Sequence, residues 1–312
     1  MNISRRGAFK VAALGAAAAT GVRKAEARER PSPPPGAKGV LYDSTLCIGC
    51  KACTVACREA NGLSLERHST LHDDAYDLTG HTASIIKLYQ DGESTAFVKQ
   101  QCMHCVDPAC VTACMLGSLQ KREGGAVTWI PDRCIGCRYC QIACPFDAPK
   151  FEWDSPLPRI VKCQMCVAKA GGTEPGQASE GREPACCEVC PRGGVIYGDY
   201  RELAAEAQAR IDANPGRYNP RVYGLDDLGG TQVLHLAPHG VEFADLGLPE
   251  YGPESVPHKP VGLQHRIYKG FMAPIALYAV LAGLSWRSRR AHEQEAEEIA
   301  EEAPERQWEA AS

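Results

Sequence analysis

The residues best suited to do chemistry are cysteines, which crowd into a few short segments. The segment RCIGCRYCQIACP at 133–145 holds four of them, and CIGCKACTVAC at 47–57 repeats their spacing, C-x2-C-x2-C-x3-C. Three thiolates two residues apart can wrap one corner of an iron–sulfur cubane, and the x3 step begins a helical turn that points the fourth thiolate away. The spacing therefore predicts iron–sulfur clusters and one-electron transfer.

All but one of the seventeen cysteines sort into four groups of four. The groups are Cys47, Cys50, Cys53 and Cys57; Cys102, Cys105, Cys110 and Cys114; Cys134, Cys137, Cys140 and Cys144; and Cys163, Cys166, Cys186 and Cys190. The first and third groups match the bacterial ferredoxin run, in which the fourth cysteine ligates the neighbouring cluster. Cys186 is assigned as a ligand because it keeps the x3 step to Cys190, whereas Cys187 is predicted to be a small, buried, non-ligating residue. Sixteen ligands predict four [4Fe–4S] clusters.

Two other uses of cysteine compete with this interpretation. A disulfide scaffold is disfavoured because seventeen is odd and tandem C-x-x-C disulfides would be strained. Zinc binds C-x2-C pairs equally well, so a zinc-stapled, membrane-tethered scaffold is the alternative from a different functional class. The uninterrupted four-cysteine run is more typical of iron–sulfur sites. Iron and acid-labile sulfide, as against zinc without sulfide, would discriminate the two.

A proline follows the last cysteine in two of the four groups. Pro145 and Pro191 occupy this place, whereas Arg58 and Met115 stand there in the other two groups. Ligation is expected to be intact in all four, but the local turn after Cys57 and Cys114 is not fixed by the sequence.

Other residues near the cysteines have expected supporting roles. Gly49 and Gly136 leave room for the backbone to approach the sulfurs. Lys51 and Arg138 follow the second cysteines and either offset cluster charge, which would raise the potential, or form solvated surface. His104 is expected to hydrogen-bond a cluster sulfur or a backbone carbonyl, since sixteen cysteines already suffice as ligands.

The elements that position these cysteines are expected to be short. Strands are predicted at 95–99, 193–199 and 231–236, a hairpin over 118–130 turns at Glu123-Gly124-Gly125, and Asp199 is expected to cap a helix over 200–213. The predicted class is α+β, with two duplicated ferredoxin-like modules, loop-rich insertions and one C-terminal transmembrane helix. The formal charge is −4, and no basic stripe stands out, so nucleic-acid binding is not indicated.

The N-terminus resembles a twin-arginine export signal. SRRGAFK at 4–10 precedes an Ala-rich run at 11–22 and a possible cleavage site at 25–27. The alternative is the basic start of an amphipathic helix. A substrate of the Tat export machinery folds and takes its metal before crossing, so cytoplasmic assembly is compatible with an external workplace.

A C-terminal membrane anchor is predicted from an uncharged run, GFMAPIALYAVLAGLSW at 270–286, followed by RSRR. Its seventeen residues reach the lower limit for a span, and the arginines favour a cytoplasmic C-terminus. The alternative is a buried core helix. The predicted divisions are a signal peptide at 1–27, a linker at 28–38, a four-cluster domain at 39–213, a Pro/Gly-rich wrap at 214–266, the anchor at 267–286 and an acidic tail at 287–312.

Nearly the whole chain resembles the iron–sulfur subunits of respiratory oxidoreductases, and most closely the HybA-type subunits of periplasm-facing, membrane-bound [NiFe] hydrogenases. The residues that carry the resemblance are LYDSTLCIGC (41–50), KQQCMHCVDPAC (99–110), DRCIGCRYCQIACPF (132–146), GGTQVL (229–234) and IYKGFMAPIA (267–276). The resemblance implies a non-catalytic relay between the hydrogenase large and small subunits and an integral-membrane, quinone-interacting subunit. It places the chain on the periplasmic face of the bacterial inner membrane. The alternative is the same relay for a molybdopterin enzyme such as formate dehydrogenase.

The resemblance also implies how the cysteines share clusters. Cys190 would join Cys47, Cys50 and Cys53, and Cys57 would join Cys163, Cys166 and Cys186. Cys144 would join Cys102, Cys105 and Cys110, and Cys114 would join Cys134, Cys137 and Cys140. Each half of the domain would then hold two clusters, and the four would form one line.

Overall fold

The computed structural model describes residues 31–64, 77–92, 94–153, 155, 158–170, 174–258, 277–295 and 297. The chain divides into two compact units. One unit is Glu29–Lys259, which contains every cysteine; the other combines Met1–Arg28 with Pro260–Ser312. The predicted signal peptide at 1–27 lies outside the described residues.

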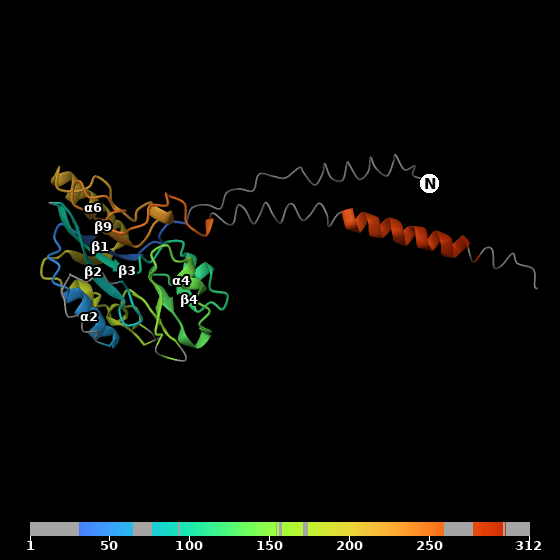
Figure 1. Cartoon of the computed structure of the whole chain (residues 1–312), viewed down its shortest axis with the longest axis horizontal. Coiled ribbons are helices and arrows are strands. Elements are labelled where there is room, and N and C mark those ends of the chain that lie inside the picture. The colour runs from blue at the N-terminus through green and yellow to red at the C-terminus, as the bar shows by residue number, and fades with distance from the viewer. Residues whose placement is uncertain are drawn as a thin grey trace, which may run out of the picture. The chain divides into compact units, whose positions relative to one another are not determined.

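The cysteine-bearing unit mixes short helices and short strands (Figure 1). The helices are α2 (Ala52–Asn61), α3 (Ala109–Thr112), α4 (Tyr139–Ala143), α5 (Ala185–Glu188) and α6 (Tyr200–Ala213), with 3₁₀ turns at Pro131–Arg133, Gln177–Glu180 and Asp227–Gly229. The strands are β1 (Lys38–Asp43), β2 (Ser84–Asp91), β3 (Ser94–Gln101), β4 (Leu119–Lys121), β5 (Val127–Trp129), β6 (Lys150–Phe151), β7 (Ile160–Val161), β8 (Val195–Asp199) and β9 (Val233–Leu236).

A three-stranded sheet in the order β8-β1-β9 separates two hydrophobic clusters. β1 pairs antiparallel with β8 and parallel with β9. Because side chains alternate along a strand, Val40 and Tyr42 lie in the cluster that contains cysteines, whereas Leu41 lies in the cluster of Leu203 and Ala207 from α6. The sheet therefore forms one wall of the cysteine-rich core, and α6 covers its other face.

The predicted helix at 200–213 is confirmed as α6. Asp199 caps it, since its Oδ1 accepts a hydrogen bond of 3.0 Å from the Arg201 backbone N–H. The hairpin predicted over 118–130 is also confirmed, because β4 and β5 pair antiparallel from Leu119–Trp129 to Lys121–Val127. The region predicted as a Pro/Gly-rich wrap supplies β9 and belongs to the same compact unit as the cysteines.

The short helices pack in two pairs, each joining sequence-distant segments. α2 contacts α5, and α3 contacts α4. Figure 1 shows α4 beside β4, at the opposite side of this unit from α2. The cysteine segments at 47–57 and 163–190 therefore meet in one place, and those at 102–114 and 134–144 meet in another.

The second unit is described only at 277–295 and 297, where the chain is helical. The anchor predicted over 267–286 begins outside the described residues and enters them at 277. None of the helices in the described parts of the chain is long and apolar enough to span a membrane. The acidic tail beyond 297 is likewise not described.

Candidate iron–sulfur site

The four cysteine segments share one backbone conformation. In each, the residue just before the second cysteine adopts a positive φ: 68° at Gly49, 49° at His104, 70° at Gly136 and 55° at Met165. The sequence suggested this only at the two glycines, because His and Met rarely adopt a left-handed conformation. The conformation can turn backbone N–H groups toward sulfur: Met165 N–H donates to Cys163 Sγ at 3.3 Å, and Gly49 N–H donates to Cys47 Sγ at 3.5 Å.

The first quartet surrounds a cavity. Cys47, Cys50, Cys53 and Cys190 line a space of about 370 Å³, part of it open to solvent, together with apolar side chains such as Ile86. Cys50 is exposed and Cys53 is buried. The structure thus brings together the first three cysteines of the first segment and the last cysteine of the fourth.

A second cavity is built in the same way at the other end of the cysteine core. Cys114, Cys134, Cys137 and Cys140 line a space of about 400 Å³ that is also partly open to solvent. Burial, together with the neighbouring thiols of Cys134, Cys114 and Cys137, raises the pKa of the Cys140 thiol to about 12. We refer to this set as the fourth quartet.

The other eight ligand candidates form two quartets that have no exposed cysteine. In the second quartet, burial raises the pKa of Cys163, and so do the adjacent thiols of Cys57, Cys186 and Cys166. In the third quartet, burial raises the pKa of Cys105, as do Cys144, Cys102 and Cys110. Each set combines cysteines of two segments, as in the first and fourth quartets.

Neighbouring quartets also lie close to one another. Cys186 of the second quartet raises the pKa of Cys53 in the first, in addition to the larger effect of burial. Cys102 of the third quartet acts in the same way on Cys163 of the second. Cys140 of the fourth quartet raises the pKa of Cys110 in the third, where burial again is the main cause of the raised pKa. These links connect the quartets in the order first, second, third and fourth.

Cys186 and Cys187 are both buried, with their sulfurs 4.0 Å apart. Cys186 is the member that neighbours Cys57, Cys163 and Cys166. Its pKa is lowered to about 6 by the hydrogen bond from Cys187, with Lys99 also lowering it against the effect of burial. Cys186, which neighbours the other thiols of the second quartet, is therefore the better candidate for the thiolate ligand.

Buried cationic and polar groups around the quartets escaped the sequence analysis. Lys99 and Lys162 are each only 1% exposed, and Lys121 donates to the backbone oxygens of His104 and Cys105 at 3.0 and 2.8 Å. The sequence signal for a buried lysine was its place just before a cysteine segment, in a strand whose other residues face inward. Such cations stabilise the negative charge that clustered thiolates and a cluster would bring.

His104 is fully buried, and its Nδ1 accepts a hydrogen bond of 2.9 Å from the Val127 N–H. Nε2 must therefore carry the proton, yet it has no partner among the described residues. Burial, followed by Lys162 and Lys121, holds the pKa of His104 well below its usual value, so the ring is neutral. The buried His104 Nε2–H is thus a donor without a protein acceptor among the described residues. His104 lies between Cys102 and Cys105 in the sequence, so a group held by these cysteines could be the acceptor.

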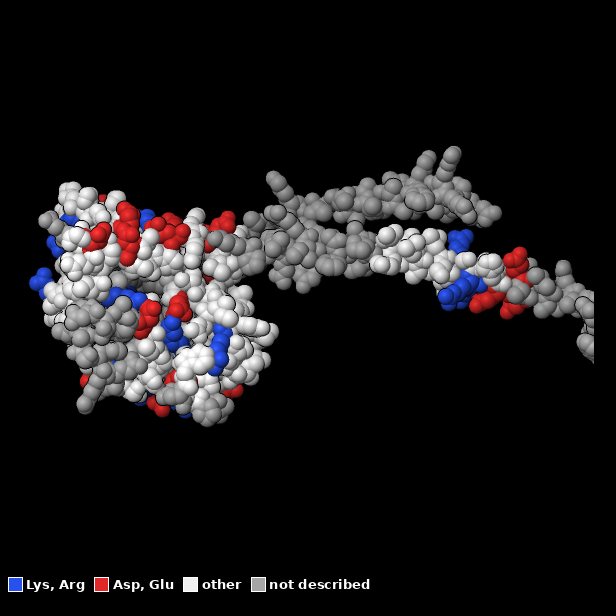
Figure 2. Space-filling model, viewed as in Figure 1, with Lys and Arg blue, Asp and Glu red and all other residues white. Residues whose placement is uncertain are grey.

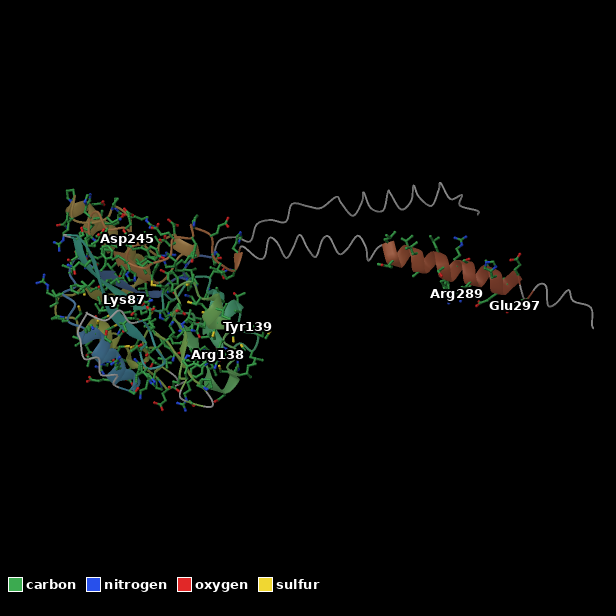
Figure 3. All side chains as sticks on the ribbon, in the orientation of Figure 1. Lys87, Arg138, Tyr139, Asp245, Arg289 and Glu297 are labelled. Atoms are coloured by element: carbon green, nitrogen blue, oxygen red, sulfur yellow. The ribbon has the colours of Figure 1, made fainter. Side chains whose placement is uncertain are left out.

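Lys51 and Arg138 occupy equivalent places in the first and fourth quartets. Both adopt positive φ, 58° and 63°, at the start of α2 and α4, and both line the cavity of their quartet. The Arg138 guanidinium also stacks 3.8 Å from the centroid of the Trp153 ring. Figure 3 shows Arg138 and Tyr139 at α4.

The donor set suits a polynuclear cluster. Thiols with raised pKa values, buried together, need a cationic core to ionise, and iron within a cluster supplies one. In the described parts of the chain, no three His, Cys, Asp or Glu side chains are arranged to hold a single metal ion. The first and fourth quartets instead line spaces of about 370 and 400 Å³.

Residues 94–200 match the family model of the 4Fe-4S dicluster domain. The chain is 38% identical to the hydrogenase-2 operon protein HybA of Escherichia coli O157:H7 over 323 residues, which cover 92% of this chain and 95% of that protein. The HybA protein of Shigella flexneri matches equally well. The nitrate-inducible formate dehydrogenase iron–sulfur subunit of Escherichia coli K12 is 32% identical over 257 residues, covering 78% of this chain and 82% of the relative.

Proposed function

The chain belongs to the HybA family of iron–sulfur electron-transfer subunits, and we propose that it relays electrons through four [4Fe–4S] clusters, one in each quartet. The sixteen ligands are the cysteines predicted from spacing, with Cys187 excluded. The clusters supply one-electron redox chemistry when bound. The protein contributes thiolates, shielding from water and hydrogen-bond donors, and it has no catalytic residue of its own.

Donors to sulfur are part of that contribution. Ser118 N–H donates to Cys114 Sγ at 3.2 Å, and Lys162 Nζ lies 3.8 Å from Cys102 Sγ. Hydrogen bonds to cluster-ligating sulfur tune reduction potentials. The two halves of the core, α2 with α5 and α3 with α4, support two duplicated ferredoxin-like modules, each holding two clusters.

The observation that carries the proposal is the connected series of quartets between two partly open ends. Cys50 in the first quartet and Cys137 in the fourth are exposed, whereas no cysteine of the two inner quartets is. An electron can enter or leave at either end and is shielded between them. Apolar side chains surround the fourth quartet, where Ile135 is 70% and Ile142 81% exposed, and Figure 2 shows a mainly uncharged surface over that part of the molecule.

The partners that we propose follow from the relatives. A [NiFe] hydrogenase, through its large and small subunits, would supply electrons from hydrogen, and an integral-membrane quinone-interacting subunit would accept them. The name of the matched HybA proteins supports a hydrogenase. The flow can also run in the opposite direction.

We further propose export by the Tat machinery and residence on the periplasmic face of the inner membrane. The twin arginines at 5–6 support export, and the uncharged run at 270–286 followed by RSRR supports an anchor with a cytoplasmic tail. A fusion of a topology reporter to the C-terminus tests the anchor.

A second candidate keeps the relay but exchanges the donor for formate dehydrogenase. The 32% identity to a formate dehydrogenase iron–sulfur subunit favours it specifically. Affinity purification of the native complex distinguishes the two, because the catalytic subunit that copurifies is either a [NiFe] hydrogenase or a molybdopterin enzyme.

Metal and sulfide analysis of the anaerobically purified chain tests the relay itself. Four clusters predict about sixteen irons with an equal amount of acid-labile sulfide, and paramagnetic signals on reduction. Zinc without sulfide would instead support the scaffold.

A further inference from the structure

Lys99 lies in the interior of β3 with its charge fully enclosed. The side chain is 1% exposed, and Nζ has no hydrogen-bond partner among the described residues. Its register partner on β2 is Ile86, which lines the cavity of the first quartet. Removing an ammonium from water is costly unless opposite charge surrounds it. The compensating charge must therefore come from groups other than hydrogen-bonding oxygens of the protein.

Thiols of two quartets act electrostatically on this ammonium. Burial alone would lower the pKa of Lys99, but Cys186, Cys53, Cys57 and Cys163 outweigh it and raise the pKa above its usual value. Cys53 belongs to the first quartet, and the other three belong to the second. Lys99 is therefore a buried cation, opposite a residue that lines the first cavity, whose charge acts on thiols of both the first and the second quartet.

The other fully buried lysine near the quartets is held differently. Lys162 Nζ donates to the backbone oxygens of Val127 and Cys163 at 2.5 and 2.9 Å, besides its 3.8 Å approach to Cys102 Sγ. Two carbonyls thus satisfy the Lys162 ammonium. The Lys99 N–H groups make no such bonds to oxygen among the described residues, so they can donate to sulfur.

We propose that Lys99 is a shared counter-charge for the clusters of the first and second quartets, a positioning residue that raises the reduction potential of both. The inference rests on the proposed function, since it requires clusters in these quartets. It adds that one side chain sets the potentials of two neighbouring carriers together.

The sign follows from electrostatics. Adding an electron makes a cluster more negative, and a nearby fixed cation stabilises that state more than the oxidised one. Removing the cation should therefore lower both potentials. Because water is excluded from the site, the fall in reduction potential should exceed the fall caused by removing a surface charge.

The test is a potentiometric titration, followed by electron paramagnetic resonance, of the full-length, anaerobically loaded chain with Lys99→Met. We expect two of the reduction steps to become at least tenfold less favourable, about 59 mV lower for a one-electron couple, with the others unchanged. Lys87→Met is the matched control, because it removes the same charge from β2, where Lys87 is partly exposed and pairs with Asp77. Figure 3 shows Lys87 in this part of the molecule. The control should leave every step within twofold of the wild type.

The outcomes separate the inference from the proposed function. A wild-type chain without iron and sulfide overturns the relay, whereas a loaded Lys99→Met chain with unchanged steps overturns only the role of Lys99. If Lys99→Met does not load fully, Lys99→Arg decides. If Lys99→Arg loads fully and Lys99→Met loses about half the iron, the result supports a requirement for positive charge at position 99. Equal losses with Arg and Met would show a purely steric role and overturn the proposal.

Discussion

The two repeated cysteine runs, 47–57 and 134–144, build the same loop but continue differently. Both have left-handed backbone at the glycine and again at the basic residue, and both then enter a helix. α4 ends at Ala143, because Pro145 forces the preceding Cys144 into extended backbone, with φ −80° and ψ 116°. Arg58 stands where that proline would be, so α2 continues to Asn61 and closes on Gly62.

The longer helix ties the first run to its surroundings. Asn61 Nδ2 donates to Cys57 O at 2.7 Å, and Asn61 Oδ1 accepts from Ala170 N–H at 2.6 Å, which joins α2 to the segment of the second quartet. In the fourth quartet, Ile135 and Ile142 are 70% and 81% exposed, and the residues at the same places in the first run, Ile48 and Val55, are 57% and 45% exposed. The residue after the last cysteine therefore decides where the helix ends, and the longer helix adds the Asn61 bonds.

The comparison predicts equal ligation in both runs, and ligand removal has the largest expected effect. Cys50→Ala and Cys137→Ala should each lose about four irons, because each quartet has one cysteine at this place. Cys187→Ala is the control and should keep all the iron, since the structure gives it no place in a quartet. Iron and sulfide assays check this. Loss of iron in Cys187→Ala equal to that in Cys50→Ala would contradict the assignment of Cys186.

The two glycines should respond unequally to substitution. A Cβ on Gly49 would lie 2.3 Å from a Phe97 ring carbon, whereas one on Gly136 would meet only Pro158 Cγ at 3.8 Å. Both substitutions pay left-handed strain of about 1 kcal/mol, and Gly49→Ala adds overpacking of about 3 kcal/mol. Anaerobic thermal unfolding should therefore show a much larger loss of Tm for Gly49→Ala than for Gly136→Ala. Equal losses of Tm would mean that left-handed backbone strain alone sets the cost of both substitutions.

The extra length of α2 can be tested with a proline. Glu59→Pro removes a helical hydrogen bond and clashes with the preceding turn, which costs about 3 kcal/mol, and the side chain it replaces is exposed. Glu59→Ala keeps the helix and should be close to wild type in Tm. If Glu59→Pro were equally stable, the continuation of α2 would contribute nothing to the packing of the first run.

The β4–β5 hairpin and α6 could be predicted because each depends on residues close in sequence, and the ligand groups stay a prediction from spacing. The sheet β8-β1-β9 could not, since it joins strands more than 150 residues apart and β1 begins where a linker was expected. His104 and Met165 adopt left-handed backbone that their residue types disfavour. Lys99 is buried close to thiols of sequence-distant segments, and the Lys162 ammonium is held by the backbone oxygens of Val127 and Cys163. In each case, tertiary contacts overrode the local preference.

The smallest predicted effect concerns the basic residue of the second run. Arg138 lies over Trp153, which is 67% exposed, and cation–π contacts at exposed sites contribute about 0.5–1 kcal/mol. Trp153→Ala should therefore barely change Tm, while the freed guanidinium is screened by water and the fourth cluster becomes slightly harder to reduce. Trp153→Phe keeps an aromatic face and should keep the wild-type potential. A large fall in Tm for Trp153→Ala, with no change in potential, would show that Trp153 packs the loop and does not position Arg138.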